Sequence, residues 1–366
     1  MRFLVSSWFI RPGTSGGWTT VADLLLPAHG MAFVGASVPG GMRSCEGVQV
    51  TGLTARARMI GRWPALNRMK ESLQRKAHAR ETRAAFAASE AELVLCTDER
   101  AALGASDAGL PYAIRFHSRP GLLPAALRDR LTASALFVTG AQPDFPGAVH
   151  LPHSIDLDRF AYSEPGKAEA ALLTTSLVEA ERPDVFVEGV SMSGLRGTVA
   201  GDGPLRGEIS AMCRRTGGRV RLVPPVSRLE LPALLSAHQI GVACLEEGWH
   251  TTYQMKVAEY QAAGLFPAVQ PWSGLAMTAP GLTRTFRTPA ELALLLDDLA
   301  ENWASTLEVR RRNREYAFAH HHVRDSRRQF EEILAAIPRP APRPACGEPR
   351  RGGPEKDADQ DVDQGG

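Results

Sequence analysis

The chain has 366 residues, 44% of them hydrophobic and 22% charged, a balance typical of a soluble globular protein with room for two domains. Its net charge of +2 excludes the strongly basic domain that nucleic-acid binding requires, so we expect no nucleic-acid partner. The five cysteines include no Cys-x-x-Cys pair, which argues against a disulfide framework or structural zinc and fits a reducing compartment.

The beginning of the chain carries no recognisable targeting signal. Its apolar run, within residues 1–8, is too short for a signal peptide, and no stretch of about 18 uninterrupted apolar residues occurs anywhere. We therefore expect a cytoplasmic protein, held at most at the inner face of the membrane.

The first half of the chain alternates short apolar runs with helical or loop patterns. The apolar runs predict strands, and residues 19–26 predict a helix. Strands that alternate with helices indicate an α/β fold with a parallel sheet. The predicted strands cover residues 3–7, 31–38, 93–96, 112–116, 135–139 and 149–151.

The alternation pauses at residues 151–156 and then restarts, which predicts a second α/β domain. Thr288 and Glu291 have capping-box spacing, with Pro289 at the first helical position, and they begin a helical region. We predict an N-terminal domain over residues 1–152 and a C-terminal domain over 153–318. A helix over 319–337 would return toward the first domain, and a Pro-, Gly- and charge-rich tail over 338–366 is expected to be disordered. The predicted strands are 170–175, 195–199, 219–223 and 240–245, and the predicted helices are 183–190, 205–215, 229–237, 251–263 and 323–337.

A series of motifs in the second half carries the strongest functional signal. In order they read HLPHSIDLDRF (150–160), VAGDGPLR (199–206), VRLVPPV (220–226), ELPALLSA (230–237), EEG (246–248) and KVAEYQAAG (256–264). The series resembles the donor-binding half of the family 4 glycosyltransferases, which are retaining GT-B enzymes. This resemblance implies two facing Rossmann-like domains and transfer of a sugar from a nucleotide-sugar with retention of anomeric configuration. It implies no metal cofactor, and we find no Asp-x-Asp donor motif placed to hold one.

Two residues of the helix that ends at Gly264 are candidates for donor binding. A ribose diol requires a carboxylate that accepts two hydrogen bonds, and phosphates require helix N-termini, backbone N–H groups and a cation. The resemblance places Glu259 on the ribose, and its small apolar neighbours favour a buried face over a solvated one. Lys256, one turn earlier, would reach a phosphate or pair with Glu259.

The sequence departs from the family pattern at two places. The usual spacing puts the family's first glutamate at Thr251, so Thr251 and Thr252 would line the site through hydroxyl and backbone groups. The family's arginine and lysine, which neutralise the leaving diphosphate, correspond here to Ser176 and Glu181. Arg182, one residue further on, is the candidate replacement; otherwise the diphosphate lacks its main clamp.

The remaining candidates lie in loops. Gly16 and Gly17 resemble the family's N-terminal glycine loop and would admit the diphosphate, or they form a plain turn. Gly203 belongs to a mainly structural turn that is as apt to touch the ligand as not. His117, after a predicted strand, would face the transferred sugar, or it is structural. We discount the tract at 320–322 as a metal site because consecutive residues on a helix face different ways.

Residues 56–83 carry nine basic and two acidic side chains, a net charge of +7. This segment is either a solvated helix or an acceptor-side surface for anionic lipid or saccharide. The expected partners are therefore a nucleotide-diphosphate sugar and a saccharide or lipid-linked acceptor, with peripheral membrane contact through 56–83. The missing clamp leaves open a second function, a glycosyltransferase-like protein that binds nucleotide or saccharide without catalysis.

Overall fold

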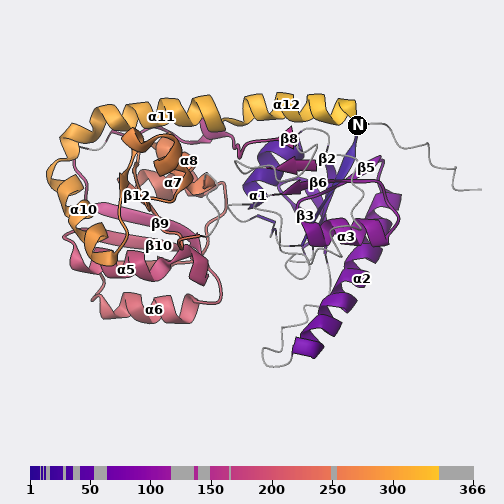
Figure 1. Ribbon diagram of the computed structural model, residues 1–366, viewed down its shortest axis with the longest axis horizontal. Helices are drawn as coiled ribbons and strands as arrows, with labels where there is room; N and C mark the ends of the chain where they lie inside the picture. Colours follow the sequence, from indigo (N-terminus) through magenta and orange to yellow (C-terminus); the bar gives the residue numbers. More distant parts are fainter. Residues whose placement is uncertain are drawn as a thin grey trace, which may run out of the picture.

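A computed structural model describes residues 1–8, 10, 12–13, 17–27, 30–35, 42–52, 64–116, 136–138, 149–164, 166–248 and 254–337. Within them the chain forms two α/β domains that lie side by side, and two consecutive helices run along one side of both (Figure 1). The predicted fold class is confirmed in these residues. The expected tail, 338–366, lies outside the described part of the chain.

The N-terminal domain is built on an eight-stranded sheet of order β3-β4-β2-β1-β5-β6-β7-β8. All neighbouring strands are parallel except β3 and β4, and the central ones are short and wholly apolar because helices cover both faces. The strands are β1 (Phe3–Ser7), β2 (Gly30–Gly35), β3 (Ser44–Cys45), β4 (Val48–Gly52), β5 (Leu93–Cys96), β6 (Tyr112–Phe116), β7 (Leu136–Val138) and β8 (Val149–His150). The helices are α1 (Gly17–Thr20), η1 (Val21–Leu25), α2 (Pro64–Ala88) and α3 (Glu99–Asp107).

The hairpin of β3 and β4 has no counterpart among the predicted elements. Its two-residue turn is Glu46-Gly47, and both residues have positive φ, 49° and 80°. This conformation matches the right-handed twist of the strands, but a glutamate adopts it at a steric cost. The turn directs Glu46 toward the second domain.

The C-terminal domain has a six-stranded sheet of order β11-β10-β9-β12-β13-β14, and every neighbouring pair is parallel. The strands are β9 (Ala170–Ser176), β10 (Arg196–Asp202), β11 (Val220–Val223), β12 (Ile240–Ala243), β13 (Phe266–Val269) and β14 (Arg284–Thr285). The helices are η2 (Leu157–Arg159), η3 (Glu179–Glu181), α5 (Pro183–Met192), α6 (Arg206–Arg215), α7 (Leu231–Ser236), α8 (Met255–Ala263), α9 (Gly274–Thr278), η4 (Pro280–Leu282), α10 (Pro289–Glu301), η5 (Trp303–Thr306) and α11 (Leu307–His321).

Local signals explain where several of these helices begin and end. Gly264 ends α8 in the left-handed conformation, with φ of 89°, which a residue with a side chain adopts poorly. Thr288 caps α10, because its hydroxyl accepts the backbone N–H of Glu291. The Glu291 carboxylate accepts the N–H of Arg287 rather than that of Thr288, so the capping box is shifted by one residue.

The chain crosses between the domains twice, and the two crossings are hydrogen-bonded to each other. The N–H of Ile155 donates to the carbonyl of His321 at 3.0 Å, and the N–H of Val323 donates to the carbonyl of Ile155 at 2.9 Å. After the second crossing, α12 (Val323–Ala336) packs against the N-terminal core, where the rings of Phe3 and Phe330 lie 5.8 Å apart. The last helix therefore returns to the first domain (Figure 1).

Candidate functional site

The strand order of the second sheet identifies where a ligand would bind. The chain runs outward in one direction from β9 through β10 to β11, and in the other from β12 through β13 to β14. In open α/β sheets, ligands bind beyond the carboxyl ends of the strands at this point of reversal. The helices that begin there are α5, after β9, and α8, after β12. Both carry candidate residues from the sequence, Arg182 at the start of α5 and Lys256 and Glu259 on α8.

Glu259 is buried and lacks a hydrogen-bond partner. Its side chain is 3% exposed, and within the described residues its Oε1 atom accepts no hydrogen bond. Burial raises the pKa of this carboxyl to about 7, against the opposing effects of the Arg159 and Lys256 cations. A buried acceptor without a donor is costly, so this position is typical of a binding site rather than of a solvated helix acid.

Lys256 is held in an ion pair with Glu181 instead of with Glu259. Its Nζ atom lies 2.6 Å from Oε2 of Glu181, and the same oxygen accepts the hydroxyl of Thr175 at 2.5 Å. Thr175 is at the end of β9 and Glu181 is in the turn before α5, so the pair joins the first turn of α8 to the start of α5. It therefore lies across the point of strand reversal.

Arg182 is also paired with a carboxylate. It has a left-handed backbone, with φ of 39° and ψ of 51°, and its guanidinium contacts Asp184 at 2.8 Å. The Asp184 carboxylate raises the pKa of Arg182. Burial raises the pKa of the Cys244 thiol, directly after β12, to about 12, and its nearest charges are Lys256, Asp184, Arg182 and Glu181. Two cations and two carboxylates thus share one locus and balance in charge.

The turn that contains Gly203 fits a structural role. A Cβ atom at Gly201 would lie 1.8 Å from the carbonyl oxygen of Thr175, and one at Gly203 would lie 2.6 Å from that of Leu177. The N–H of Leu205 donates to the same Leu177 carbonyl at 3.0 Å. The two glycines therefore let the ends of β9 and β10 approach closely.

The N-terminal domain reaches this site through α1, which Gly17 begins. The hydroxyl of Thr20 lies 3.2 Å from the sulfur of Met255, the first residue of α8, so α1 and α8 are in contact. Gly16, His117, Thr251 and Thr252, the other candidates from the sequence, lie outside the described residues.

A charged cluster between the domains was not predicted. Asp23, in η1, is 4% exposed, and its carboxylate contacts Arg228 at 2.7 Å and Arg159 at 3.2 Å and accepts the N–H of Asp156 at 3.0 Å. Burial raises the pKa of Asp23, and the two arginines and the N–H of Asp156 oppose that rise. Arg228 also contacts Glu46 at 2.5 Å. The available signal was an aspartate inside the apolar run 21–26, which a surface helix would not place on its buried face.

The histidine tract at 320–322 is not continuous helix, as the sequence predicted. α11 ends at His321, and His322 has extended backbone and caps α12 by accepting the N–H of Arg324 at its Nδ1. Its Nε2 lies 3.1 Å from the Asp158 carboxylate, near Asp156. Because Nδ1 accepts a hydrogen bond, the ring proton lies on Nε2 and points to Asp158, an arrangement of capping rather than of metal ligation.

Comparisons with known proteins agree with this geometry. Residues 182–332 match a family described as glycosyl transferase-like, and no curated protein matches the chain. Three solved structures align over 92% of this chain and at least 98% of their own. HepE of Anabaena, in complex with UDP and glucose, is 14% identical with a TM-score of 0.67. Sucrose-phosphate synthase from Thermosynechococcus elongatus is 12% identical with a TM-score of 0.70, and a glycosyltransferase from Rickettsia africae is 10% identical with a TM-score of 0.63.

The fold is GT-B. The expected pair of Rossmann-like domains with a helical C-terminal region is confirmed, and the family match over residues 182–332 supports the predicted glycosyltransferase. In the described part of the chain, no helix is both long enough and apolar enough to cross a membrane.

Proposed function

We propose that this protein transfers a sugar from a nucleotide-diphosphate sugar, of which a UDP-sugar is the first candidate, to a saccharide or lipid-linked acceptor. The observation that carries the proposal is the buried, unpartnered carboxylate of Glu259 beside Lys256 at the point of strand reversal. The glycosyl transferase-like match over residues 182–332 and the structural neighbour HepE, solved with UDP and with UDP-glucose, support the choice of ligand.

Glu259 would bind the ribose of the donor. An ionised carboxylate accepts several hydrogen bonds, so two ribose hydroxyls that donate to it would satisfy the unpartnered Oε1 atom. Hydrogen bonds to the charged form favour ionisation, so donor binding would lower the raised pKa of Glu259.

Lys256 would face the diphosphate, together with the backbone N–H groups at the beginnings of α5 and α8. We infer from the resemblance that transfer proceeds with retention, that His117 faces the transferred sugar, that the loop of Gly16 and Gly17 admits the diphosphate, and that no metal is required. Thr251 and Thr252 would line the sugar side. Activity that survives chelation of divalent cations would support the metal-independent reaction.

One observation favours a second function, nucleotide binding without catalysis. Arg182 and Lys256, the two cations assigned to the diphosphate, are both paired with carboxylates, Asp184 and Glu181. A diphosphate whose charge grows as the glycosidic bond breaks would then meet a weakly positive locus. Such a protein would bind UDP and release no UDP from a UDP-sugar.

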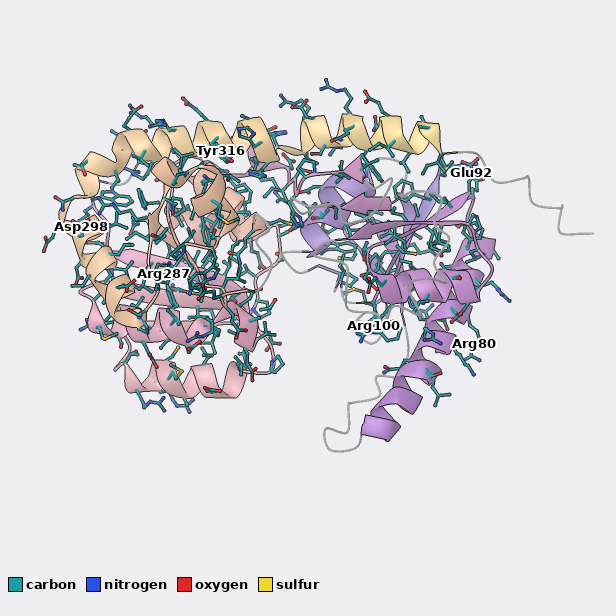
Figure 2. The ribbon with its side chains drawn as sticks, viewed as in Figure 1. Arg80, Glu92, Arg100, Arg287, Asp298 and Tyr316 are labelled. Carbon is teal, nitrogen blue, oxygen red and sulfur yellow. The ribbon has the colours of Figure 1, made fainter. Side chains whose placement is uncertain are left out.

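The test is a thermal-shift and turnover measurement on purified protein with UDP, GDP, ADP and their sugar conjugates. A ligand that binds only the folded state raises the melting midpoint. We expect a rise with one nucleoside diphosphate that disappears in Glu259→Gln and persists in Asp298→Asn, a matched acid-to-amide change at the outer edge of the C-terminal domain (Figure 2). No rise with any nucleotide would contradict the proposal, and binding without release of nucleoside diphosphate would favour the second function.

We also propose that the basic segment 56–83 lies on the acceptor side and contacts an anionic surface. α2 extends away from the body of the N-terminal domain (Figure 1). Arg75 pairs with Asp107 and Arg83 donates to the carbonyl of Ala108, which leaves Lys76 and Arg80 exposed (Figure 2). Co-flotation with anionic but not neutral vesicles, reduced in a Lys76→Gln, Arg80→Gln double variant, is the expected result; a protein that stays free of both vesicles would contradict it.

A further inference from the structure

The ion pair between Lys256 and Glu181 has an unusual position. Glu181 belongs to the turn after β9 and Lys256 to the first turn of α8, which follows β12, so the pair spans the two helix N-termini at the reversal point of the sheet. Both side chains are largely buried, 14% exposed for Lys256 and 23% for Glu181. The Glu181 carboxylate has a second donor, the hydroxyl of Thr175 at 2.5 Å.

The position of the carboxylate opposes the expected ligand. Helix N-termini and an ammonium group attract phosphate, whereas a carboxylate in contact with the same ammonium repels it. A phosphate oxygen bound to Lys256 would be a close neighbour of Glu181, and the two negative charges interact strongly in a partly buried site. The diphosphate must therefore displace Glu181 from Lys256 or bind against its charge.

We propose that Glu181 is a gate residue that holds Lys256 in the unliganded protein and weakens its binding of the donor diphosphate. This inference rests on the proposed function, because it requires that phosphate groups bind at Lys256. It makes Glu181 a determinant of donor affinity that acts through Lys256, with Thr175 keeping the carboxylate in place. The effect applies to the phosphate part of the ligand and leaves the nucleoside part unaffected.

The test compares wild-type protein with Glu181→Gln by titration calorimetry with UDP, UMP and uridine. Glutamine keeps an oxygen that accepts the Thr175 hydroxyl and the Lys256 ammonium, so the fold and the position of Lys256 are retained. We expect UDP to bind about tenfold more tightly to Glu181→Gln, UMP to gain less, and uridine to bind equally to both. The gain in UDP affinity should shrink as salt concentration rises.

Two controls separate the gate from general electrostatics and from misfolding. Asp298→Asn removes one negative charge from an ion pair of the same domain far from the domain contact, and it should leave UDP affinity unchanged (Figure 2). Glu181→Ala, which removes the carboxylate without replacing its oxygen, should also bind UDP more tightly. Melting midpoints of all variants confirm that each is folded.

Each remaining outcome contradicts the gate. Weaker UDP binding by Glu181→Gln would show that Glu181 positions Lys256 for the phosphate, and unchanged UDP affinity would show that it has no effect. UDP binding that needs MgCl2 in the wild type and is lost in Glu181→Gln would make Glu181 a cation ligand. Failure of every nucleotide to bind either protein would overturn the proposed function and the gate together, whereas the first three outcomes overturn the gate alone.

Discussion

Asp23 and Glu259 are buried carboxylates on opposite sides of the domain contact, and they differ in the partners that surround them. Asp23 is 4% exposed and contacts two arginines and a backbone N–H. Glu259 is 3% exposed, and within the described residues its Oε1 atom has no donor. Burial raises the pKa of both, but only at Asp23 do close donors and two contacting arginines oppose it.

The difference shows how one physical cost serves two purposes. Asp23 recovers the cost of its burial from Arg159 and Arg228, residues of the second domain, so it joins the domains. Glu259 does not recover that cost within the protein alone, and an unsatisfied buried group that persists in a fold indicates a functional position. The comparison therefore separates an interdomain contact from a binding site by the supply of hydrogen-bond donors.

The largest expected effect is at the interdomain contact. Asp23→Asn leaves Arg159 and Arg228 buried without their shared anion, and we expect a loss of about 3 kcal/mol in the free energy of unfolding. Chemical denaturation followed by circular dichroism measures it, with Asp298→Asn as the matched surface control. A variant as stable as the control would show that the cluster does not hold the domains together.

The second prediction concerns the dependence of stability on pH. The pKa of Glu259 is about 7 in the folded protein and 4.5 as its ordinary value. The folded state therefore binds the proton more tightly, so this contribution to stability is fully present below pH 4.5 and is lost as the pH rises through 7. By linkage it amounts to about 3 kcal/mol.

Glu259→Gln should lack this contribution, because its amide does not ionise. Its melting midpoint relative to the wild type should therefore rise as the pH increases from about 4.5 to above 7. Melting curves across this range measure the difference. Parallel curves for the two proteins would show that the carboxyl of Glu259 ionises normally, which would contradict the contrast with Asp23.

The third prediction separates the nucleoside part of the site from the phosphate part. Loss of charged hydrogen bonds to the ribose should weaken uridine and UDP binding by Glu259→Gln about tenfold to a hundredfold. Inorganic pyrophosphate should bind this variant and the wild type equally. Calorimetry with the three ligands measures both, and an equal loss for pyrophosphate would place Glu259 on the phosphate rather than on the ribose.

The smallest expected effect tests the geometry of the Asp23 cluster. Arg228 contacts Asp23 through Nη1 and Glu46 through Nε, and a lysine keeps the charge but not the two-pronged geometry. Arg228→Lys should cost about 1 kcal/mol, well below the cost of Asp23→Asn. A loss as large as that of Asp23→Asn would mean that geometry, rather than charge, dominates the contact.

Local signals in the sequence predicted much of the fold because they act over a few residues. The alternation of apolar runs with helical patterns located the central strands, and Gly264 and Thr288 marked the helix ends. The β3–β4 hairpin was missed because its turn, Glu46-Gly47, requires a glutamate with positive φ, which is an unusual choice. The break at His322 was missed because no proline or glycine marks it.

The candidate site divides in the same way. Motif spacing singled out Glu259, Lys256 and Arg182, and the structure brings the elements that carry them to one edge of the sheet. Their partners could not be read from the sequence, because Glu181 reaches Lys256 across 75 residues and Arg228 reaches Asp23 across 205. Such contacts depend on how two elements pack, which no local pattern records.

The sequence by itself therefore determined the two α/β domains, the order of their strands along the chain and the identity of the acidic and basic candidates, since hydrophobic period and turn chemistry are local properties. Only the tertiary structure decided which charge meets which. It placed Lys256 on Glu181 and Arg182 on Asp184, and it left Oε1 of Glu259 without a donor among the described residues. The physical reason is that burial and pairing, which set the energy of a charge, arise only when distant segments exclude water together.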